Sequence, residues 1–308
     1  MLYEKTKKID LENLFKNKPD YHPFPVYRER DAWDSLEQDV KQVWISKADE
    51  LLDYSWPALR MEYYLLLKRT GDMQTAWRAF CERRSALGIF LIAECIEGKG
   101  RYLDQIINGI FAVCEETSWL QSLFMKDRNF ALPNENDNYV DLCSSETAQL
   151  FAWILYLLGD ELDAECGEIR GRMNREVYRR VISQYIERDD YWWMGFTDDR
   201  INNWNPWCNM NILMACAFMD FDPGIKAKAV EKVTRSLDQY FEQYPDDGAC
   251  DEGPMYWGAA GAGLGICIEL LKGMSGGAVD GSGIDKLRRI GAYFYKVHID
   301  KDWFVNYA

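Results

Sequence analysis

Residues 143–160 have the sequence CSSETAQLFAWILYLLGD, and this stretch decides the fold class. Its apolar side chains recur three or four positions apart, at Cys143, Leu150, Phe151, Ile154 and Leu158. That spacing puts them on one face of an α-helix, whereas a half-buried strand would alternate apolar and polar residues. We expect the helix to end at Gly159-Asp160, because glycine is common just past the last helical turn.

The same spacing continues from about Trp33 to Lys296, with turn residues between the helical stretches. One helix is expected to start at Ser35, because Gln38 three residues later completes a capping box. We therefore predict an all-α fold of about ten to twelve antiparallel helices. A bundle, a solenoid, or helical hairpins closed into a ring would each fit this pattern.

Three segments follow from this pattern. Residues 1–32 are expected to be extended or irregular, residues 33–298 to form the helical domain, and residues 299–308 to begin a linker or strand. The chain ends on the extended-type stretch Trp303-Phe304-Val305-Asn306-Tyr307-Ala308. We therefore expect the sequence to be a fragment of a longer protein.

The charge balance excludes two classes of partner. The chain has 36 Lys+Arg and 50 Asp+Glu residues, a formal net charge of −14, which repels nucleic acid and anionic membrane surfaces. It has no apolar stretch of the roughly 18 residues needed to span a bilayer, and no apolar segment follows Met1. We expect a cytoplasmic protein if the sequence is untrimmed, and a periplasmic or secreted one if a leader was removed.

Many aromatic residues lie in the breaks between helices. They include Trp119, Trp192, Trp193, Trp204, Trp207, Tyr256 and Trp257. Flat rings at the mouth of a groove stack on the apolar faces of pyranose rings, while nearby amides and carboxylates bond the hydroxyl groups. The pattern favours a ring or groove that binds sugar, although many of these residues could equally be core.

Three loop segments place amides, carboxylates or phenols beside indoles. They are residues 114–119 (CEETSW), 201–209 (INNWNPWCN) and 246–257 (DDGACDEGPMYW). In this order they resemble the heparinase II/III-type polysaccharide lyases. Further likeness comes from Asp141-Leu142 with Glu146-Thr147-Ala148, and from Phe304-Val305-Asn306-Tyr307-Ala308. The resemblance implies an incomplete (α/α) toroid. In the family, a C-terminal β-sandwich domain follows the toroid as its partner, and this sequence does not include that domain.

The resemblance also implies β-elimination on an acidic polysaccharide or oligosaccharide that contains uronic acid. A hydrogen-bond donor must neutralise the uronate carboxylate, and other groups must remove the adjacent proton and protonate the leaving oxygen. By motif, Asn203 matches the neutralising amide, with Asn205 and Asn202 as rivals, and Tyr256 matches the acid or base. The substrate-binding candidates are Trp119, Glu116, Asn202, Trp204, Trp207, Trp193, Glu252 and Trp257.

Several alternatives stay open. The asparagines could simply cap helix ends, and Glu252 could interact only with a helix dipole. Many relatives have a histidine after the asparagine, where this chain has Trp204. A toroid glycoside hydrolase would use two carboxylates among Asp198, Asp199, Asp247, Asp251 and Glu252. A non-catalytic carbohydrate-binding domain is the third possibility. With two histidines and scattered cysteines, we expect no metal and no cofactor.

Overall fold

The computed structural model describes residues 1–308 except 18, 122–131, 136–137 and 306–308. The described part is mostly helical, which confirms the predicted all-α class. The chain divides into two compact units. One contains His22–Val181, and the other combines Met1–Tyr21 with Ile182–Ala308. These units do not follow the boundary expected at residue 33.

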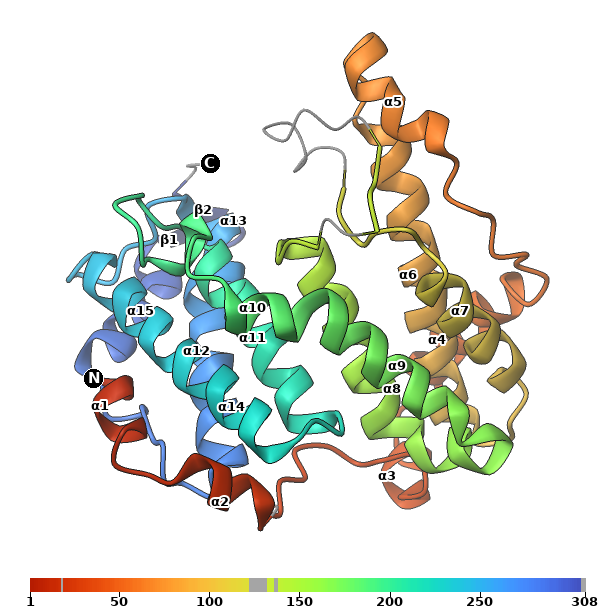
Figure 1. Cartoon of the computed structure of the whole chain (residues 1–308), viewed down its shortest axis with the longest axis horizontal. Coiled ribbons are helices and arrows are strands. Elements are labelled where there is room, and N and C mark those ends of the chain that lie inside the picture. Colours follow the sequence, from red (N-terminus) through yellow and green to blue (C-terminus); the bar gives the residue numbers. More distant parts are fainter. Residues whose placement is uncertain (18, 122–131, 136–137, 306–308) are drawn as a thin grey trace. The chain divides into compact units, whose positions relative to one another are not determined.

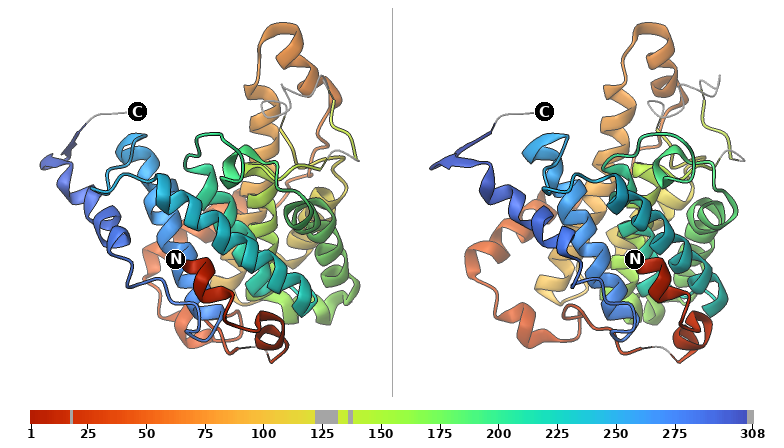
Figure 2. Two further views of the ribbon diagram at one scale, coloured as in Figure 1. Left: turned by 60° about the vertical axis from the view of Figure 1, so that its left-hand side comes forward. Right: turned by 90° about the vertical axis from the view of Figure 1, so that its left-hand side faces the viewer.

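The unit His22–Val181 is built around one long helix, α6 (Gln74–Glu97). It packs against α3 (Arg30–Asp34), α4 (Gln38–Glu50), α5 (Met61–Thr70), α7 (Leu103–Cys114) and α8 (Leu142–Cys166). Helix α9 (Glu168–Val177) covers α7 and α8. Figures 1 and 2 show α5, in orange, beyond the start of α6. Gly71 and Gly98 end α5 and α6 in the left-handed conformation, with φ of 78° and 69°.

The second unit is centred on α11 (Trp204–Phe218), which packs on α12 (Pro223–Gln243) and α14 (Gly263–Met274). Its other elements include α10 (Ser183–Glu187), α13 (Gly253–Trp257), α15 (Asp285–Lys296), the π-helical turn Gly258–Ala262 and the 3-10 turn Trp192–Met194. The π-helical turn Tyr178–Ile182 lies at the end of the unit His22–Val181. Strands β1 (His298–Asp300) and β2 (Trp303–Phe304) form an antiparallel hairpin, blue in Figures 1 and 2.

The N-terminal segment differs from the irregular stretch expected there. It contains α1 (Leu2–Thr6) and α2 (Leu11–Lys16), and both helices pack on α12. Asp238 on α12 accepts hydrogen bonds from the backbone N–H groups of Leu2, at 2.8 Å, and Tyr3, at 3.1 Å. These bonds satisfy donors that the first turn of a helix leaves without intrahelical partners. A carboxylate distant in sequence therefore holds α1 in place, which local sequence could not reveal.

Two predicted helix boundaries are wrong. Helix α4 begins at Gln38, and the Ser35 hydroxyl donates to Ala32 at the end of α3 instead of capping α4. Helix α8 continues through Gly159 to Cys166. A Cβ atom at Gly159 would lie 2.5 Å from the Arg170 guanidinium. Glycine at 159 therefore allows α9 to approach α8 closely and does not mark a helix end.

Helix α8 begins at a fully buried carboxyl group. One oxygen of Asp141 accepts a hydrogen bond from the Ser144 backbone at 2.7 Å, and the Ser144 hydroxyl accepts one from the Asp141 backbone at 3.0 Å. The other carboxyl oxygen, Oδ2, has no hydrogen-bond partner among the described residues. Burial raises the pKa of Asp141 to about 7. The folded state therefore favours the protonated form.

This burial predicts a pH-dependent stability difference for Asp141→Asn. Because the folded pKa lies above the unfolded one, the wild type loses stability as the pH rises from about 4 to about 7. Asparagine caps helices about as well as aspartate and carries no charge. In urea unfolding, the variant should gain up to about 4 kcal/mol relative to wild type between pH 4 and pH 8. A constant difference across this range would contradict the buried carboxyl.

Candidate functional site

The second and third predicted segments meet within one unit, where two helices begin. Asn203 immediately precedes α11, and Glu252 immediately precedes α13. The Asn203 side-chain amide donates to Glu252 Oε2 at 2.6 Å, and the Asn203 backbone N–H lies 3.3 Å from the same oxygen. Asn203 is 3% exposed, so this bond forms largely out of water. A short contact to a carboxylate in such surroundings fixes the orientation of the amide.

Tyr256 lies four residues after Glu252, about one turn further along α13. Its side chain is 41% exposed. The sharp turn before it requires Gly253, whose φ of +85° other residues rarely adopt. A solvent-accessible phenol therefore follows Glu252 closely in the sequence.

Around this pair lie a second asparagine and two indoles. The side-chain oxygen of Asn202 accepts a hydrogen bond from the Trp204 backbone at 3.0 Å, so Asn202 caps the start of α11. The Trp204 ring tilts against that of Trp192, with centroids 5.3 Å apart. Trp204 and Trp207 are both partly exposed. Trp204 is therefore the predicted indole that the structure places directly at the Asn203 turn.

Sequence reasoning missed a cation beside this site. Arg200 forms an ion pair with Asp251, and their side chains are 79% and 41% exposed. Arg200 lies shortly before Asn203 in the chain, and Asp251 lies immediately before Glu252. The ion pair therefore links the same two chain segments as the Asn203–Glu252 bond. The only sequence cue was the position of Arg200 two residues before Asn202. Because Asp251 offsets this guanidinium, the pair as a whole adds no net charge, and Arg200 could meet an acidic ligand only by exchanging Asp251 for it.

Asn205 and Trp193 have structural surroundings instead of the substrate contacts that we expected. The Asn205 amide donates to the Trp193 carbonyl and to the Ser236 hydroxyl, both at 2.9 Å. Asn209 joins the same network and accepts a bond from the Tyr185 hydroxyl at 2.7 Å. Burial raises the pKa of Tyr185 well above its usual value, so its hydroxyl remains a donor. Asn205 and Trp193 are both fully buried, so neither side chain is accessible to a ligand in this conformation.

Trp257 also has a packing role. Its indole N–H donates to the Ile290 carbonyl at 2.9 Å, and its ring lies 5.5 Å from that of Phe294. A Cβ atom at Gly261 would come within 2.4 Å of the same indole nitrogen. The ring therefore holds α15 against the turn that follows α13, and only its partly exposed edge remains for a ligand.

Glu116 and Trp119 belong to the other unit, where they are buried. Glu116 accepts hydrogen bonds from Arg83 at 2.9 Å and from Arg84 at 2.7 Å. The Trp119 indole donates to the Val113 carbonyl at 3.0 Å, and Arg180 lies 4.9 Å above its ring. Trp119 is only 1% exposed. Trp119 is therefore part of the core, whereas Glu116 is a buried ion-pair residue that also lines a cavity.

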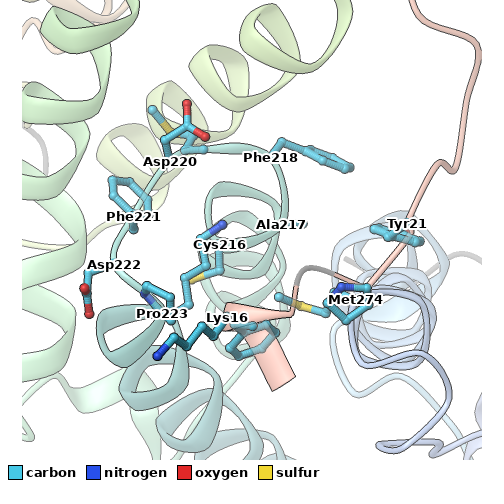
Figure 3. A pocket seen from close by; sticks show the side chains of 14 residues that line it. Lys16, Tyr21, Cys216, Ala217, Phe218, Asp220, Phe221, Asp222, Pro223 and Met274 are labelled. Carbon is cyan, nitrogen blue, oxygen red and sulfur yellow. The ribbon is translucent and has the colours of Figure 1, made fainter. Parts of the chain in front are cut away.

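Cavities lie elsewhere in the described structure. One of about 280 Å³ adjoins Glu116 and is also lined by Trp56, Tyr64 and Arg83. Figure 3 shows another, of about 550 Å³, whose walls include Lys16, Asp220 and Asp222 around Cys216. None of the predicted site residues is among the described residues that line it. Among described residues, no cluster of three or more His, Cys, Asp or Glu side chains could hold a metal ion.

The buried Glu116 cluster predicts a large loss of stability on Glu116→Gln. The Glu116 and Arg83 side chains are each 3% exposed, so removing the anion leaves buried guanidinium charge uncompensated. Unfolding in urea should show a loss of about 3 kcal/mol or more. Glu115→Gln is the matched control, because Glu115 is 67% exposed and pairs with Arg172 at the surface. It should change stability by less than about 1 kcal/mol. Equal effects of the two substitutions would contradict the buried cluster.

Comparison with known proteins adds no family to this geometry. Neither the protein-family models nor the curated proteins give a match to the chain. In the described part, no helix combines the length and apolar character needed to cross a membrane.

Proposed function

We propose that the protein is a polysaccharide lyase-like enzyme that performs β-elimination on a uronic acid-containing glycan. The observation that carries the proposal is the 2.6 Å bond between Asn203 and Glu252. It joins two of the segments in which the chain resembles heparinase II/III-type lyases, although 49 residues separate them in the sequence. Two motif segments that converge in one unit, beside a solvent-accessible tyrosine, fit one shared site better than unrelated loops.

Asn203 suits the role of charge neutraliser. Its amide has two N–H donors, and Glu252 accepts one of them. Because the side chain is only 3% exposed, this role requires substrate binding to bring the second donor into contact with the substrate carboxylate. That bond lowers the cost of developing negative charge when the adjacent carbon loses its proton. Glu252 would thus act as a positioning residue that holds the amide in one orientation. Arg200 could add positive charge only by exchanging Asp251 for the substrate.

Tyr256 suits the proton-transfer roles. A phenol can take the proton from the sugar carbon in its ionised form and can protonate the leaving glycosidic oxygen in its neutral form. Trp204 and Trp192 would offer ring faces to the sugar. Asn205, Trp193, Glu116 and Trp119 would support the site only by holding the fold. The proposed architecture is the incomplete toroid of the same family, for which the succession of long helices in both units is the support.

Tyr256→Phe provides the direct test of the reaction. The purified protein is incubated with heparan, hyaluronan, chondroitin, alginate and pectin fragments, and the ultraviolet absorbance of the new unsaturated uronate is followed. We expect product from one of these glycans, and a loss of about 100-fold or more in rate with the variant. Tyr295→Phe is the matched control, because Tyr295 is a 72% exposed tyrosine outside the site. It should retain the wild-type rate.

Two results would reject the lyase, and a third would reject the role of Tyr256. Reducing ends without the unsaturated product, lost in Glu252→Gln or Asp251→Asn and retained in Tyr256→Phe, would establish a hydrolase that uses two carboxylates. Glycan binding with neither product would establish a carbohydrate-binding domain. An unchanged elimination rate in Tyr256→Phe would remove this residue from the mechanism.

A further inference from the structure

Helix α4 leaves part of its apolar face uncovered. Val40 and Val43 on α4, and Leu36 in the turn before it, recur three or four positions apart, which is the spacing of one helix face. In the structure, these side chains are 37%, 43% and 52% exposed. Helix α4 still packs on α6, so the exposed row is a second apolar edge of an otherwise docked helix. Such an edge is a common feature of partner-binding surfaces.

The row leads into an apolar groove of about 530 Å³ within the unit His22–Val181. Leu36 belongs to both, so we call the groove together with Val40 and Val43 the α3–α6–α8 groove. Its lining residues come from the segment before α3, from α3, α6 and α8, and from the turn after α3: Phe24, Pro25, Ala32, Trp33, Leu36, Gly88, Leu91, Ile92, Leu150, Trp153 and Leu157. Every one of these residues is apolar, so an occupant is held by burial of apolar surface.

Gly88 keeps the groove open. It lies in the interior of the 24-residue helix α6, where glycine is less favourable than alanine. A Cβ atom there would meet nothing within 4 Å, so the fold itself does not require a glycine. The missing side chain instead leaves space at a position that lines the groove. A larger residue would stabilise the helix and fill this space.

Negative charge beside the groove favours a positively charged occupant. Residues 29–39, which include α3 and the turn to α4, contain five carboxylates and one arginine. The carboxylates are Glu29, Asp31, Asp34, Glu37 and Asp39. Glu29 pairs with His22 and Asp34 pairs with Arg30, so Asp31, Glu37 and Asp39 are the ones that form no salt bridge with other described residues. This acidic edge repels a second copy of a chain whose net charge is −14. It attracts a basic partner.

We propose that the α3–α6–α8 groove binds a basic amphipathic helix of a partner polypeptide. Apolar side chains of such a helix, spaced at i, i+3, i+4 and i+7, would enter the groove and cover Val40 and Val43. Its lysines and arginines would face the carboxylates of residues 29–39. This inference is independent of the proposed lyase activity, because none of the site residues in the other unit takes part.

Gly88→Leu tests the proposal without removing any existing contact. The probe is a labelled synthetic peptide of about 14 residues, with leucines at helical spacing and lysines elsewhere, measured by fluorescence anisotropy at physiological salt. We expect the wild type to bind it, and Gly88→Leu to weaken binding by about tenfold or more because leucine fills the groove. Gly265→Leu is the matched control. Gly265 also lies in a helix with nothing within 4 Å of a Cβ atom, but outside the groove.

A scrambled peptide of the same composition separates groove binding from charge attraction. It keeps every lysine and loses the apolar face, so it should bind about tenfold more weakly than the probe. The double substitution Asp31→Asn with Glu37→Gln should lower the affinity for the probe and reduce the salt dependence of binding. Equal affinities of wild type and Gly88→Leu, or of the two peptides, would overturn the proposal. The proposal would also be overturned if an apolar dye bound in the groove of the wild-type protein while the peptide probe did not bind.

Discussion

The bond between the Asn203 amide and the Glu252 carboxylate is the constraint on which the proposed site depends. It is formed where α11 and α13 begin, and each residue immediately precedes the first turn of its helix. Because helix starts leave unpaired N–H donors, the carboxylate also lies where the helix dipoles favour negative charge. This one contact therefore orients the Asn203 amide and holds the starts of α11 and α13 together. It also fixes the start of the helix that carries Tyr256.

The same carboxylate creates an electrostatic tension. A substrate uronate next to Glu252 would meet another negative charge, and the chain as a whole carries −14. Arg200 could offset part of this locally only by exchanging Asp251 for the substrate. The remaining amide proton of Asn203 must then supply much of the stabilisation. Chemistry of this kind benefits from a preorganised donor, which the short bond to Glu252 provides.

The sequence predicted the helices well because helix periodicity and left-handed glycine caps are local properties. Gly71 and Gly98 end helices in the left-handed conformation, which is a local property of glycine. Gly159 does not end a helix, because its role is set by Arg170 on the next helix. The cap of α1 by Asp238 and the exposed row on α4 were likewise invisible, since both depend on which elements pack together. Local pattern cannot report a contact between distant segments.

The candidate site was predictable only in part. The motif segments supplied Asn203, Glu252 and Tyr256, and the structure shows that the first two are in contact. Composition could not separate a groove indole from a core indole, and Trp119 and Trp193 are both core. The polar network around Asn205 could not be predicted either, because the sequence does not distinguish an asparagine that bonds backbone carbonyls from one that binds substrate.

The most direct test of the account is a crystal structure of the Tyr256→Phe protein with a uronic acid oligosaccharide bound. The account predicts a uronate carboxylate within about 3 Å of the Asn203 side-chain nitrogen, with Glu252 still bonded to the same amide and the sugar carbon beside the Phe ring at position 256. A sugar bound away from the start of α11, or an Asn203 amide with no contact to the carboxylate, would contradict it.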